Sequence, residues 1–134
     1  MRGLLFFVFA LFVCNAIAES RPALGGVSAV RIANYNSPSM VVKDTGSIVR
    51  ELNQLRRSKD WRRGEAKISC YSTIVFLRGE NKRVAEFRVT PAAIVERPVE
   101  KGQGSYSIEV TPGDLPELMR QLGEAQPAKD CPTN

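Results

Sequence analysis

The amino-acid sequence predicts an α+β domain in which an antiparallel sheet of four to five strands carries two helices on one face. Two stretches have apolar residues at helical spacing, and several others have the alternation of β-strands. The strand segments follow one another instead of alternating singly with helices, which is typical of α+β folds. The expected order is strand, helix, two strands, an optional further strand, a last strand and a helix.

The N-terminus has the three parts of a secretory signal peptide. Arg2 is a short positive start, Leu4–Val13 is apolar, and Ala16–Ala18 supplies the small residues at which signal peptides are cleaved. The apolar run has about ten residues, which is too few for a membrane span of about 20. We therefore expect export and cleavage after Ala18. Lipoprotein processing at Cys14 and an uncleaved N-terminal anchor are the alternatives.

Cleavage would leave 116 of the 134 residues, which is enough for one hydrophobic core. No later segment is apolar enough to cross a membrane. We expect a bacterial periplasmic or secreted protein. The expected parts are a signal peptide over 1–18, a flexible leader over 19–27, one domain over 28–123 and a tail over 124–134 tethered by a disulfide.

The first expected strand is Ser28–Tyr35, where Val30 and Ile32 flank Arg31. A turn follows at Asn36-Ser37-Pro38-Ser39, and Met40–Val42 is short and extended.

The clearest helix follows, with Asp44 or Thr45 as its N-terminal cap and an end near Arg57. Its apolar stripe consists of Ile48, Val49, Leu52 and Leu55.

Lys67–Leu77 and Lys82–Thr90 predict a hairpin around a turn at Arg78–Asn81. Ala93–Val95 is the optional strand, and Ser105–Val110 is the last.

The second helix is expected at Leu115–Leu122, with Asp114 near its start and Gly123 at its end. Its apolar side consists of Leu115, Leu118, Met119 and Leu122.

Two cysteines, Cys70 and Cys131, remain after removal of the signal peptide. An even number of cysteines in an exported chain predicts a disulfide. This bond would lay the tail across the sheet. The alternative is two independent thiols.

The residue types argue against most catalytic chemistry. The chain contains no histidine, which excludes Ser-His and Cys-His nucleophilic sites, and it has no phosphate-binding glycine loop. We expect neither a metal nor another cofactor. Two carboxylate pairs, Glu80 with Glu86 and Glu96 with Glu100, leave a small hydrolase as the weakest alternative.

One local bias in charge points to an interaction surface. The candidate patch consists of Arg56, Arg57, Lys59, Trp61, Arg62 and Arg63. Arginine and tryptophan are enriched at interface hot spots. The competing interpretation is a solvated helix end, with Trp61 in the core.

These features favour a non-enzymatic periplasmic domain that binds another protein, as an inhibitor, immunity protein or accessory protein. The first alternative is an envelope protein that touches anionic lipid through the basic patch. Nucleic acid is a poor candidate, because the net charge of +5 for the whole chain is modest and the patch has one aromatic residue.

Overall fold

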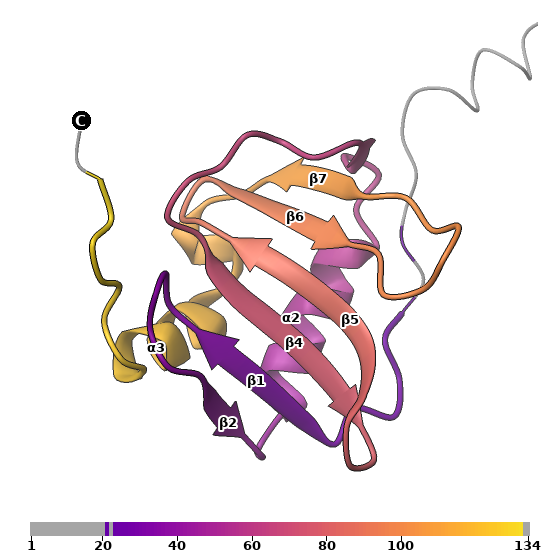
Figure 1. Ribbon diagram of the computed structural model, residues 1–134. Helices are drawn as coiled ribbons and strands as arrows, with labels where there is room; N and C mark the ends of the chain where they lie inside the picture. Colours follow the sequence, from indigo (N-terminus) through magenta and orange to yellow (C-terminus); the bar gives the residue numbers. More distant parts are fainter. Residues whose placement is uncertain (1–20, 22, 133–134) are drawn as a thin grey trace, which may run out of the picture.

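The computed structural model describes residues 21 and 23–132 (Figure 1). The predicted signal peptide, its cleavage site and Cys14 lie outside these residues. The strands are β1 (Ala29–Ala33), β2 (Met40–Val42), β3 (Arg62–Arg63), β4 (Ser72–Arg78), β5 (Lys82–Val89), β6 (Ala93–Arg97) and β7 (Tyr106–Glu109). The helices are α2 (Gly46–Arg56), the short 3₁₀ helix η1 (Pro112–Asp114) and α3 (Pro116–Glu124).

The seven strands form one sheet in the order β2-β1-β4-β5-β6-β7-β3, and the neighbouring pairs are antiparallel. The α+β class is confirmed, but the predicted count of four to five strands is too low. The additional strands are the two edges, β2 with three residues and β3 with two. Segments this short carry no alternation that could predict a strand. Short edge strands are also one means by which sheets avoid edge-to-edge association.

The predicted hairpin is present as β4 and β5, joined by a turn in which Gly79 has a φ of +63°. Its first strand begins at Ser72, five residues later than predicted. The reason is the backbone of Cys70, whose φ of +55° interrupts an extended conformation.

Both helices cover the same face of the sheet, behind the strands in Figure 1. Ile48 and Leu52 of α2 and Leu118 and Leu122 of α3 are buried against it. The core also contains Val30, Ile32, Trp61, Ile74, Phe76, Ala85, Phe87, Val89, Ile94, Ile108 and Leu115. Within residues 21 and 23–132, the other face of the sheet carries no helix, and we call it the helix-free face (Figure 1).

Two details of the helix ends differ from the prediction. Thr45 occupies the N-cap position of α2, but its side chain makes no capping hydrogen bond. Gly123 does not end α3, because the helix continues through Glu124.

The start of α3 is capped by a side chain of α2. The Glu51 carboxylate accepts hydrogen bonds from the backbone N–H groups of Glu117 at 2.7 Å and Leu118 at 3.1 Å. These N–H groups have no partner inside their own helix. Burial nevertheless raises the pKa of the Glu51 carboxyl group above its usual value. Glu51 therefore joins the two helices with a charge that is partly desolvated.

The predicted disulfide between Cys70 and Cys131 is present. The sequence led us to expect that the tail lies across the sheet, and this prediction is wrong. It runs beside the turn between β1 and β2, where the N–H of Lys129 donates to the carbonyl oxygen of Tyr35 at 3.0 Å. The disulfide therefore holds the tail at one end of the sheet.

Candidate functional site

The structure does not present the basic patch of the sequence as one surface. Arg56 is 5% exposed and Trp61 is fully buried, where its indole N–H donates to the carbonyl oxygen of Leu55 at 2.9 Å. Arg57 and Lys59 are exposed beyond the end of α2. The competing interpretation placed Trp61 in the core, and this is where Trp61 lies in the structure.

The remaining two members of the patch form β3 and are exposed. Arg62 lies opposite Ser107 of β7, and Arg63 lies opposite Tyr106. Because successive side chains of a strand point to opposite faces, the two guanidinium groups diverge.

Arg56 takes part in a buried cluster of charges. Its guanidinium group donates to both carboxylate oxygens of Glu96, at 3.0 and 2.7 Å. Arg21 adds a second cation at 3.4 Å and stacks on Tyr106, with 3.7 Å from its guanidinium carbon to the ring centre. The backbone N–H of Arg21 also donates to the carbonyl oxygen of Arg56. This geometry joins the N-terminal segment, α2 and β6, and it leaves Glu96 little capacity for other partners.

The other candidate carboxylates have ordinary surroundings. Glu86 is paired with Arg83 at 3.0 Å, and Glu80 and Glu100 are exposed in turns. Among residues 21 and 23–132, no three Cys, Asp or Glu side chains are grouped so that they could hold a metal ion.

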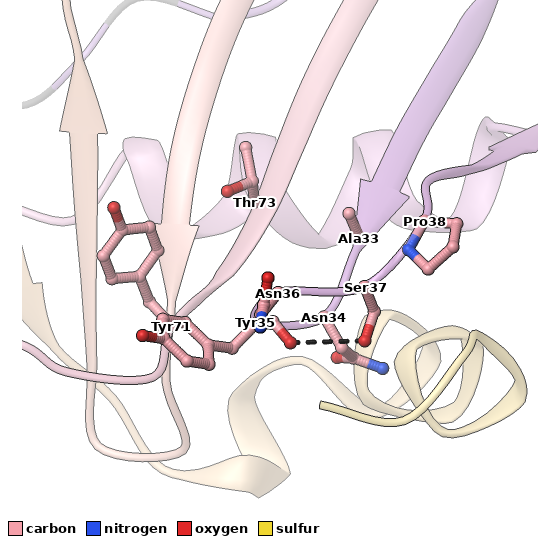
Figure 2. Close-up of a pocket in the computed structure, with 8 residues that line it drawn as sticks. All are labelled: Ala33, Asn34, Tyr35, Asn36, Ser37, Pro38, Tyr71 and Thr73. Carbon is pink, nitrogen blue, oxygen red and sulfur yellow. Dashed lines mark hydrogen bonds between the residues drawn. The ribbon is translucent and has the colours of Figure 1, made fainter. Parts of the chain in front are cut away.

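The structure has an open depression of about 460 Å³ at the end of the sheet where the tail is attached. Figure 2 shows two tyrosine side chains on one side of it and Ala33 and Pro38 on the other. We call this site the tyrosine depression. Its lining residues are Ala33, Asn34, Tyr35, Asn36, Ser37, Pro38, Tyr71 and Thr73. Ala33 and Thr73 pair across β1 and β4 and place the depression on the helix-free face.

Several polar groups of the depression have unused hydrogen-bonding capacity. No hydrogen bond within the described chain involves the side chains of Tyr35, Asn36, Tyr71 or Thr73. They offer two phenol hydroxyls, an amide and an alcohol, so both donors and acceptors are available to a ligand.

The other two polar side chains hold the lining in place. Asn34 donates to the carbonyl oxygens of Leu122 and Gln126 and accepts from Ser72, while Ser37 donates to the carbonyl oxygens of Tyr35 and Pro127. The lining turn is therefore fixed from behind by α3 and the tail.

The disulfide joins the two tyrosine walls. Cys70 immediately precedes Tyr71, while Cys131 lies two residues after Lys129, whose N–H binds the backbone of Tyr35. The disulfide therefore links the segments that carry the two rings.

Residues with a left-handed backbone are concentrated at the same place. The described chain has three non-glycine residues with a left-handed backbone: Asn36, Cys70 and Asp130, with φ near +55°. For a residue such as cysteine this conformation costs about 1–2 kcal/mol. Asn36 lines the depression, and the other two belong to the disulfide and its flank. Strained residues that the surrounding structure holds in place are concentrated at functional sites.

Charged side chains border the tyrosine depression on the helix-free face. The guanidinium carbon of Arg88 lies 4.7 Å from the centre of the Tyr71 ring. Glu65 pairs with both Arg88 and Arg97 at 3.6 Å.

Sequence reasoning identified the turn at Asn36-Ser37-Pro38-Ser39 and the disulfide, but it missed this site. The sequence did contain a feature that could have indicated the site, because a tyrosine adjoins both the turn and the disulfide: Tyr35 precedes the turn, and Tyr71 follows Cys70. The pairing of β1 with β4 that brings the two together was not predictable from either segment.

None of the helices in the described chain is long and apolar enough to cross a membrane. Comparison of the chain with protein-family models, with curated proteins and with solved structures finds no match.

Proposed function

We propose that the protein is a non-enzymatic exported domain that binds another protein through the tyrosine depression and the adjoining helix-free face. The observation that carries the proposal is the set of unpaired polar side chains on two aromatic walls: Tyr35, Asn36, Tyr71 and Thr73. Tyrosine and arginine are enriched where protein interfaces are strongest, and Arg88 stacks on Tyr71.

Binding fits the lining better than catalysis does. The lining contains no carboxylate, lysine or cysteine, and the hydroxyl of Ser37 is directed at backbone carbonyl oxygens instead of a general base. The four unpaired groups are hydroxyls and an amide that can donate and accept hydrogen bonds, which suits recognition.

Export is supported by two features. The first 18 residues have the pattern of a signal peptide, and the Cys70–Cys131 disulfide is of the kind that persists in oxidising compartments. We therefore place the function in the periplasm or outside the cell.

Affinity capture from the native envelope or medium, with the exported and oxidised protein as bait, tests this function. The test variant is Tyr35→Ala with Tyr71→Ala, and the control is Arg57→Ala with Lys59→Ala, two exposed residues outside the depression. We expect one protein in near-equal amount with the wild type and the control, and loss of at least about tenfold with the tyrosine variant.

Equal recovery by all three baits would contradict the proposal. Binding to phosphatidylglycerol vesicles that is lost only with the control variant would instead favour the alternative of lipid contact through basic residues.

A further inference from the structure

The turn behind the tyrosine depression already binds one extended segment, the protein's own tail. Residues 126–132 are neither helix nor strand and include Pro127 and Pro132. Asn34 and Ser37 donate to consecutive carbonyl oxygens of this segment, at Gln126 and Pro127. On this side, the turn thus binds the backbone carbonyl groups of a segment that contains proline and has no helix or strand.

The side of the turn that faces the depression offers the same chemistry. Asn36 and Thr73 supply amide and hydroxyl groups, the two tyrosines add phenol hydroxyls, and the aromatic rings and Pro38 supply apolar surface. A polyproline II segment has no internal hydrogen bonds, so its carbonyl groups remain available. Such segments dock in grooves lined by aromatic residues.

The absence of charged side chains from the lining limits which ligands can enter the depression. None of the eight lining residues is an aspartate, glutamate, lysine, arginine or histidine. The lining itself therefore offers no ionic partner to a carboxylate or ammonium group, whose desolvation would be unfavourable, and the Arg88 that borders it is already paired with Glu65. A segment that fills it has to be uncharged at that point.

We propose that the partner enters the tyrosine depression as an extended, uncharged segment that contains proline. This inference rests on the proposed function and specifies which part of the protein partner is bound. The preformed polyproline II conformation loses little entropy on binding, which suits a shallow and open site.

The test uses the oxidised protein and a library of acetylated and amidated peptides. Each peptide has about 12 residues, so that in the polyproline II conformation it reaches beyond the depression. Proline is fixed at every third position, and the other positions are random uncharged residues. A second library has alanine at the fixed positions, and a trimer of N-acetylglucosamine is the neutral saccharide probe. Binding of selected peptides is measured by calorimetry.

We expect the proline library to yield binders that lose about fivefold or more in affinity when the prolines are changed to alanine. Tyr71→Ala should weaken them by about tenfold or more, and Tyr71→Phe by about threefold through loss of one hydrogen bond. The Arg57→Ala, Lys59→Ala control should bind as the wild type does.

Equal binding of both libraries overturns the proline assignment, and binding of the saccharide alone overturns the peptide assignment. If neither library binds although capture of a protein still requires the two tyrosines, this inference fails and the proposed function stands. If capture also fails, both fail.

Discussion

At the scale of single residues, Arg56 shows how a charged side chain can become part of the interior. It follows Leu52 by four positions and Ile48 by eight, so it lies on the buried stripe of α2. Arginine in such a position would be unfavourable alone, but Glu96 provides a bidentate partner 40 positions away in the sequence. The sequence pattern shows the buried stripe of α2 but does not show that Glu96 pairs with Arg56. Arg56 was therefore assigned to an exposed patch.

Substitution of Arg56 should therefore affect stability far more than substitution of its exposed neighbour. In Arg56→Ala, Glu96 keeps only the longer contact with Arg21, and we expect a loss of about 3–5 kcal/mol in the free energy of unfolding. Arg57→Ala should change it by no more than about 0.5 kcal/mol. Urea denaturation measures both, and similar losses would contradict the role assigned to the ion pair.

Glu51 should give a pH-dependent contribution to stability. Because burial raises its pKa in the folded state above 4.5, folding favours the protonated form. Its contribution is therefore complete below pH 4.5 and is lost as the pH rises through the folded-state pKa. The free energy of unfolding of the wild type, minus that of Glu51→Gln, should fall over this window. A difference that rises with pH in urea titrations would exclude this explanation.

At the scale of elements, the helices and the long strands were predictable because each carries its own periodicity. The stripe of Leu115, Leu118 and Leu122 lies on the core as expected. The end of α3 was not predictable, because glycine is a common helix terminator and the sequence does not show that Gly123 keeps helical geometry here.

Gly123→Ala should stabilise the protein by about 0.5–1 kcal/mol. Gly123 is helical, and no other atom lies within 4 Å of a Cβ built there, so alanine would gain helix propensity without a clash. Gly79→Ala is the matched control. The space around Gly79 is equally open, but its φ of +63° disfavours alanine by about 1–2 kcal/mol. Thermal unfolding should show opposite signs, and two shifts of the same sign would contradict the argument.

Neither edge strand was counted in the predicted sheet: Met40–Val42 was expected to be extended but was not assigned to the sheet, and β3 was not expected at all. β2 pairs with β1 and β3 pairs with β7 through backbone hydrogen bonds at the two edges of the sheet. Val41 of β2 is 51% exposed, while Val42 beside it is 8% exposed and belongs to the core, so a strand of three residues shows too little alternation to be recognised from the sequence. Pairing of this kind depends on the assembled sheet.

At the scale of the whole molecule, the disulfide joins segments 61 positions apart and fixes both walls of the tyrosine depression. The disulfide could be predicted from the number of cysteines and the expected compartment. Its position beside the tyrosine depression could not be predicted, because that position depends on where the tail and the β1–β2 turn meet.

Cys70→Ser with Cys131→Ser should lower the free energy of unfolding by about 4 kcal/mol, the value expected for a loop of this length. Under conditions in which the variant remains folded, amide hydrogen exchange should accelerate most at Lys129, whose N–H binds the carbonyl oxygen of Tyr35. The amides of β5 should change least. Uniform acceleration would show that the disulfide stabilises the fold without a particular effect on the depression.

The contacts of Arg21 determine how far the N-terminus can be shortened. Removal of Arg21 takes away the cation on Tyr106, the second partner of Glu96 and a backbone hydrogen bond to the end of α2. Intact-mass spectrometry of the protein recovered from its host should therefore show trimmed forms that all retain Arg21. A stable population that begins beyond this residue would show that the domain does not depend on the contact.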